Sequence, residues 1–104
     1  MSETQFLIMC GLISPAHGYG IMQTIDHLTG GAVSVGPGTM YGTLKKLLRN
    51  GLISQMGSYE ARERRIIYAL TKRGREALER EIERLELLAA IGKAKRSELR
   101  RNHE

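Results

Sequence analysis

Cations and small hydroxylated side chains gather in the segment "GPGTMYGTLKKLLRNGLI", residues 36–53. After Pro37, which suits a first helical turn, apolar residues recur at helical spacing: Met40, Leu44, Leu47 and Leu48. The opposite face of this helix then carries Thr39, Gly42, Lys45, Lys46 and Arg49, with Tyr41 and Thr43 at its two borders. A DNA major groove about 12 Å wide admits such a slim face, and its cations gain by displacing counterions from phosphates.

A second basic cluster follows this helix. The runs at residues 52–59 and 64–70 are typical of strands, and the charged tip "EARER" separates them. They predict a hairpin whose tip and return strand carry Arg62, Arg64 and Arg65. Such a wing can contact DNA backbone or minor groove beside the helix, so these three residues complete the predicted DNA-binding set.

The net charge of +5 is distributed unevenly along the 104 residues. Residues 37–75 hold nine Lys and Arg against two Glu, whereas residues 1–36 hold two acids and no Lys or Arg. The pattern indicates one surface for a polyanion.

Helices must position these side chains. Ser2 and Gln5 predict a capping box before the apolar run at residues 4–13. A second helix is expected over about residues 17–29, ended by Gly30 and Gly31. We therefore predict a mainly α fold with a small antiparallel β-hairpin: a winged helix-turn-helix over residues 1–72, followed by a C-terminal dimerisation helix.

The last helix is predicted over residues 73–92, with Thr71 as its cap. An apolar seam on an otherwise charged helix indicates an interface. The predicted dimerisation residues are Phe6, Leu78, Ile82, Leu85, Leu88 and Ala89. Residues 93–104 lack apolar periodicity and predict a basic, disordered tail.

Three blocks of the chain resemble the PadR family of winged-helix transcriptional regulators: "HGYGI" at residues 17–21, "GPGTMYGTLKKLLRNGLI", and "RRIIYALTKRGREAL" at residues 64–78. The resemblance implies a homodimer that binds a palindromic operator as a repressor, with each third helix and wing on one half-site. It also implies that Tyr41 bonds a phosphate or packs at the helix entrance. A small-molecule effector of unknown identity is a further candidate partner.

Other functions find less support in the residues. His17, His27 and His103 lack ligand spacing, and no catalytic constellation or phosphate-binding loop is present, so we expect no enzyme, no cofactor and no metal. The lone Cys10 lies in an apolar run and predicts a small buried hydrophobe rather than a redox sensor. Without a signal peptide or membrane anchor, we expect a cytoplasmic protein. A winged-helix module that binds protein, or nucleic acid without sequence preference, stays open as the alternative.

Overall fold

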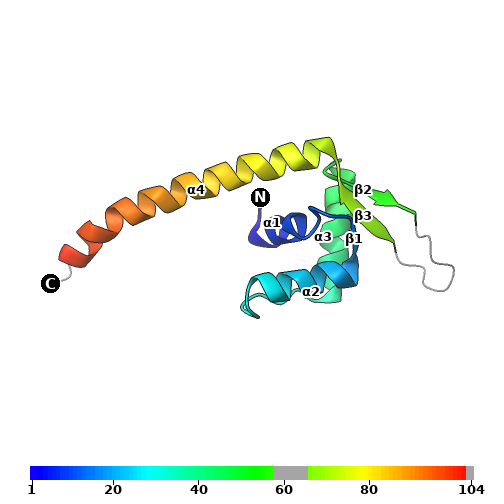
Figure 1. Ribbon diagram of the computed structural model, residues 1–104, viewed down its shortest axis with the longest axis horizontal. Helices are drawn as coiled ribbons and strands as arrows, with labels where there is room; N and C mark the ends of the chain where they lie inside the picture. Colours follow the sequence, from blue (N-terminus) through cyan, green and yellow to red (C-terminus); the bar gives the residue numbers. More distant parts are fainter. Residues whose placement is uncertain (58–65, 103–104) are drawn as a thin grey trace.

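Four helices and three short strands make up the described part of the chain, residues 1–57 and 66–102 of the computed structural model (Figure 1). The elements follow in the order α1 Glu3–Cys10, β1 Ala16–His17, α2 Gly18–Leu28, α3 Pro37–Arg49, β2 Ile53–Met56, β3 Ile67–Leu70 and α4 Lys72–Arg101. The predicted fold class, mainly helical with a small antiparallel sheet and a long last helix, is confirmed.

Helix α1 begins at the predicted capping box. The Ser2 hydroxyl accepts from the Gln5 amide at 3.1 Å, and the Gln5 side chain accepts from the Ser2 amide at the same distance. The helix ends at Cys10, before the end of the apolar run. Pro15 follows closely. Because helical geometry is unfavourable for the residue before a proline, the chain becomes extended here.

The sheet has the strand order β1-β3-β2, and both pairings are antiparallel. Its register sets Ile53 opposite Leu70 and Met56 opposite Ile67 in the predicted hairpin. Strand β1 was not predicted, because two residues are too short to show a period of two. It pairs Ala16 with Tyr68 and so ties the start of α2 to the wing.

Helix α3 lies at the centre of the core. Its predicted stripe faces the core: Met40, Leu44 and Leu47 are almost fully buried, and Leu48 is half-buried against them. The fully buried side chains around it come from α1, α2 and the turn after α1: Ile8, Met9, Leu12, Ile21 and Ile25. Cys10 packs against this core, and burial raises the pKa of its thiol, as expected for a structural cysteine.

Helix α4 starts at a close contact with the turn after α3. The Thr71 hydroxyl caps the helix by accepting from the Gly74 amide at 3.0 Å, and it donates to the Gly51 carbonyl at 2.7 Å. Gly74 is buried directly against the Leu52 backbone. A Cβ atom at position 74 would lie 1.9 Å from the Leu52 carbonyl oxygen, so only glycine fits there.

The long last helix corrects one prediction. Residues 93–101 continue α4 instead of forming a disordered tail, while residues 103–104 lie outside the described part. Extending a helix that is already packed needs no new nucleus, and Ala, Lys, Arg and Leu are good helix formers. Arg100 and Arg101 in the last turn also favour the negative end of the helix dipole.

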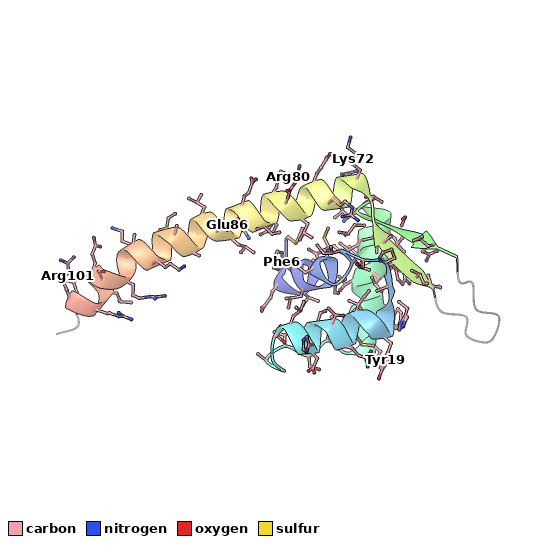
Figure 2. The ribbon with its side chains drawn as sticks, in the orientation of Figure 1. Phe6, Tyr19, Lys72, Arg80, Glu86 and Arg101 are labelled. Carbon is pink, nitrogen blue, oxygen red and sulfur yellow. The ribbon has the colours of Figure 1, made fainter. Side chains whose placement is uncertain are left out.

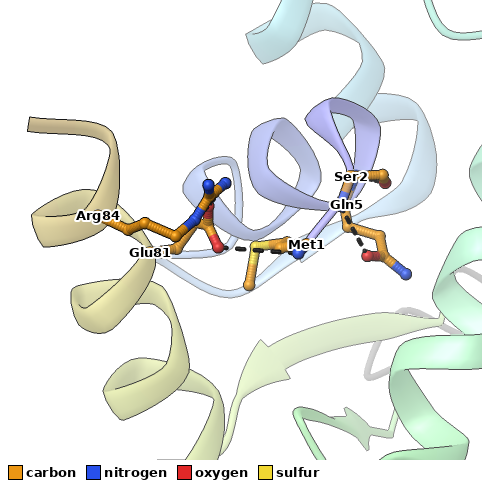
Figure 3. A network of polar contacts seen from close by, with 5 residues as sticks. All are labelled: Met1, Ser2, Gln5, Glu81 and Arg84. Atoms are coloured by element: carbon orange, nitrogen blue, oxygen red, sulfur yellow. Dashed lines mark hydrogen bonds and ion pairs between the residues drawn. The ribbon is translucent and has the colours of Figure 1, made fainter. Parts of the chain in front are cut away.

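A buried carboxylate joins α4 to the start of the chain (Figure 3). Glu81 is buried and accepts from the Arg84 guanidinium at 2.8 Å through Nε, and the Met1 amino group lies 3.8 Å from its other oxygen. Hydrogen bonding to Arg84 lowers the pKa of Glu81, outweighing the opposing effect of burial. The carboxylate therefore favours its charged form in the folded chain.

We predict that Gly74→Ala destabilises the fold by about 3 kcal/mol or more, because the new methyl group would displace the backbone at Leu52. Gly92→Ala is the matched control in the same helix. Position 92 has open space around it, so alanine there should leave stability unchanged or raise it by up to about 1 kcal/mol. Urea unfolding of both variants measures the difference, and equal effects would contradict the packing role of Gly74.

The lowered pKa of Glu81 makes the stability of the fold depend on pH. Glu81 contributes stability above its ordinary pKa of 4.5, and this contribution is lost as pH falls through the lowered value. We expect Glu81→Gln to be less stable than wild type at about pH 7, with the gap closing toward about pH 3. Unfolding at several pH values tests this, with the exposed Glu79→Gln as control. A gap that widens on acidification would refute it.

Candidate nucleic-acid interface

Helices α2 and α3 form a helix-turn-helix, with residues 29–36 as the link. Gly30 and Gly31 have φ angles of +60° and +82°, which glycine adopts without strain. The Thr29 hydroxyl donates to the Ile25 carbonyl at 2.8 Å and accepts from the Val33 amide at 3.1 Å. These contacts end α2 and set the direction in which α3 begins.

Most of the outer face of α3 is open to solvent. Thr39, Tyr41, Gly42, Lys45, Lys46 and Arg49 are exposed, and Thr43 is half-buried at the edge. Gly36, Gly38 and Gly42 add no side chains to this surface, and no neighbouring segment lies against them, so the surface projects little. The structure therefore brings all seven α3 residues of the predicted set onto one accessible side.

The outer face of α3 carries three cations. Lys45, Lys46 and Arg49 form no ion pair with any carboxylate among residues 1–57 and 66–102. Lys46 and Arg49 lie in the last turn, where they also complement the helix dipole. Such cations, on a surface of small side chains, can neutralise the phosphates of a DNA backbone.

Tyr41 packs across the start of α2. A Cβ atom built at Gly18 would lie 2.8–2.9 Å from the Tyr41 phenol ring and hydroxyl, so the ring rests directly on Gly18. The ring is nevertheless 50% exposed. Burial and then the nearby Tyr41 raise the pKa of the Tyr68 phenol, against a hydrogen bond with Gln55, so α3 and the wing meet here.

The first turn of α2 adds a residue that the sequence did not single out as a contact. Tyr19 is exposed and points away from α1 and α4 (Figure 2), and its ring stacks on His17 at 6.5 Å between centroids. His17 caps α2 by accepting from the Gly20 amide at 3.0 Å. Tyr19 is part of the "HGYGI" block of the sequence, but only the fold shows that its neighbour Gly18 lies against Tyr41 of α3.

The wing is described only at its base. Ser54, Gln55 and Met56 of β2 are exposed, as is Ile66 before β3. The predicted DNA-binding residues Arg62, Arg64 and Arg65 lie outside the described residues.

The predicted dimerisation residues divide into two groups. Leu78 is buried within its own chain and Phe6 is half-buried against the core. Exposed along α4 are Ile82, Leu85, Leu88 and Ala89. Leu87 and Ile91, which the predicted seam omitted, are also exposed, at 60% and 51%.

A helix-turn-helix followed by a two-stranded wing defines the class of winged-helix proteins, and this chain has that architecture. Residues 8–80 match the family described as "Transcriptional regulator PadR-like family", and the chain belongs to this family. Membership of a family of transcriptional regulators is consistent with the expectation that the chain is not an enzyme.

Solved structures show the same fold. A transcriptional regulator from Clostridium thermocellum is 25% identical, with a TM-score of 0.77 over 86% of this chain and 89% of that one. Bacillus subtilis PadR in complex with operator DNA is 24% identical, with a TM-score of 0.70 over 79% of this chain and 47% of that one.

A relative from Streptomyces fradiae, a 37.1 kDa protein in transposon TN4556, is 37% identical over 81 residues. The match covers 77% of this chain but only 22% of that protein, so the chain spans about a fifth of this relative's length.

Among the described residues, no three His, Cys, Asp or Glu side chains are grouped as metal ligands. No helix in this part of the chain is long and apolar enough to cross a membrane.

We predict that Gly18→Ala pushes the Tyr41 ring from its place and destabilises the fold by about 1–3 kcal/mol. A double-mutant cycle with Tyr41→Ala tests the cause, since removal of the ring should remove most of the penalty of alanine at position 18. Gly38→Ala, in open space, serves as the control. An unchanged penalty in the Tyr41→Ala background would place the clash elsewhere.

Proposed function

We propose that this protein is a sequence-specific DNA-binding transcriptional repressor that binds a palindromic operator as a homodimer. The observation that carries the proposal is the outer face of α3, which is slim, exposed and cationic, and whose cations have no ion-pair partner among residues 1–57 and 66–102. Lys45, Lys46 and Arg49 would contact DNA, with Thr39, Gly42 and Thr43 close to base edges. The cytoplasmic location expected from the sequence is part of this proposal.

Tyr41 has a defined place in this proposal. Its ring lies on Gly18 while half of its surface stays open, so the phenol hydroxyl can meet a phosphate at the helix entrance. Arg62, Arg64 and Arg65 of the wing would contact the neighbouring backbone or minor groove. Support comes from B. subtilis PadR, which shares the fold and whose structure contains operator DNA.

A homodimer accounts for the exposed apolar residues of α4. Ile82, Leu85, Leu88 and Ala89 would pair across a two-fold axis, with Phe6 beside them. Such an axis sets two copies of α3 against two half-sites, which is why the operator should be palindromic. A small-molecule effector between the last helices would act by changing the spacing of the two copies of α3.

The experiment is a titration of the purified protein against its own upstream DNA and a scrambled control at two salt concentrations, with mass measured in parallel. Operator binding by a dimer that weakens with salt but keeps its preference supports the proposal. Equal binding to both DNAs that salt abolishes would favour the alternative, a non-specific nucleic-acid-binding module. No binding to DNA at all would favour a protein-interaction module.

We predict that Lys46→Ala and Thr43→Ala each reduce operator affinity about tenfold and reduce the preference over scrambled DNA, since one base contact contributes roughly 1–3 kcal/mol. Lys95→Ala removes the same charge from the far part of α4 and should change operator affinity less than about threefold. Fluorescence anisotropy measures both. A larger effect of Lys95→Ala than of Lys46→Ala would refute base reading by α3.

A further inference from the structure

Glu81 is the last residue of α4 that the chain itself buries. The buried residues of this helix are Gly74, Leu78 and Glu81, and every later residue of the helix is exposed (Figures 1 and 2). Residues 72–81 form the root of α4, and residues 82–101 form its arm. At about 1.5 Å per residue, the arm is about 30 Å long. Any change in the direction of the root is amplified along this length.

Two separate contacts hold the root against the body. At its start, Gly74 rests on the Leu52 backbone, just after α3. At its end, Glu81 faces the start of α1, where the Met1 amino group lies 3.8 Å from the Glu81 carboxylate (Figure 3). Two contacts that are about 10 Å apart along one helix define its direction. The contact at Glu81 therefore sets the angle at which α4 leaves the body.

The Glu81 carboxylate has a defined orientation. The Arg84 guanidinium donates to Oε1, at 2.8 Å through Nε, and the Met1 amino group lies on the side of Oε2. Ser2 and Gln5 form the capping box directly after Met1, so the amino group is fixed relative to α1. Arg84 thus directs one carboxylate oxygen toward α1, and the ion pair joins the two helices at one point.

Apolar packing alone leaves this angle less well defined. Phe6 of α1 and Leu85 of α4 line a hollow of about 260 Å³ beside Glu81, so side chains do not fill the space between the two helices. Such space allows two helices to tilt against each other, whereas a polar contact weakens steeply when its geometry is lost.

Stability alone does not explain a buried carboxylate at this position. Removing a charge from water carries a desolvation penalty, and apolar side chains that replace a buried ion pair often leave a protein equally stable. Within residues 1–57 and 66–102, Glu81 is the one charged side chain that is buried. A requirement for one specific geometry accounts for this residue better than a gain in stability.

We propose that Glu81 is a positioning residue that fixes the angle between α4 and the winged-helix body, and through this angle the spacing of two copies of α3 on DNA. The inference rests on the homodimer and operator of the proposed function, but the contacts that carry it lie within one chain. A tilt of about 10° about Gly74 would move Lys95, about 30 Å along the helix, by about 5 Å. Successive base pairs are about 3.4 Å apart, so such a tilt changes the half-site spacing that the two copies of α3 can reach.

The angle can be measured directly in the full chain. Spin labels on Gln23→Cys of α2 and Lys95→Cys of α4, both at exposed positions, report their separation in a Cys10→Ser background. A large excess of unlabelled chain leaves only the distance within one chain, so the measurement does not require a dimer. The variants are Glu81→Gln and Glu81→Leu, with the exposed Glu83→Gln as control.

We expect a single narrow distance in wild type and in Glu83→Gln. Each Glu81 variant should broaden or shift this distance by about 5 Å, the displacement given by a tilt of about 10°. Glu81→Leu should stay folded, because leucine fills the same place and the Arg84 side chain, already 53% exposed, can turn to water. A distance that is as narrow and as long in both Glu81 variants as in wild type would overturn the inference.

Operator binding tests the consequence for DNA. The probe is the protein's own upstream DNA, either intact or with one or two base pairs inserted at the centre of its palindrome, and fluorescence anisotropy measures the affinity. Wild type should bind the lengthened DNA at least about tenfold more weakly than the intact DNA, whereas the Glu81 variants should lose less than about threefold. A merely structural role of Glu81 would weaken binding at every spacing alike.

The outcomes separate the failure of this inference from that of the proposed function. If wild type prefers one spacing and both Glu81 variants keep that preference unchanged, Glu81 does not position the two copies of α3. If wild type binds upstream and scrambled DNA equally, the proposed function fails, while the spin-label distances still decide whether Glu81 fixes the angle of α4.

Discussion

Burial of one side of α3 is the constraint on which the molecule depends. Met40, Leu44 and Leu47 fill the space among α1, α2 and the sheet, so the helix cannot rotate without exposing them to water. Its opposite side is therefore held outward, together with Lys45 and Lys46. One packing requirement both stabilises the core and orients the proposed DNA-binding face.

Two glycines let the other elements approach this helix. Gly74 brings the first turn of α4 against the backbone just after α3, and Gly18 brings the first turn of α2 under the Tyr41 ring. Neither has a positive φ angle, so the absence of a side chain, rather than backbone freedom, explains both. The wing joins the same place through the pairing of β1 with β3.

The environment of α4 changes along the helix, from buried in its first turns to exposed in its later turns. Its first turns are part of the core, where Gly74, Leu78 and Glu81 are buried. Its remaining turns carry exposed leucines and isoleucine and then cations, so they do not add to the core of their own chain. The structure extends over 64 Å as a result (Figure 1), and the proposed pairing would cover the surface that a single chain leaves open.

Local patterns in the sequence determined much of this molecule. The capping box at Ser2, the stripe of α3, the cap at Thr71 and the order of helices and hairpin all follow from spacing over a few residues, and the PadR-like family was predicted from three short blocks. The seven α3 residues of the predicted interface are on one side because helical periodicity alone decides that. Their roles on DNA remain part of the proposal.

Tertiary structure decided what depends on contacts between distant segments. Strand β1 exists because β3 offers it a partner, and the start of α2 meets Tyr41 of α3 because Gly18 has no side chain. The helical state of residues 93–101 was missed, since polarity suggested disorder while the packed root of α4 allows the helix to continue without a new nucleus. Periodicity within one segment carries no information about which distant segment will lie against it.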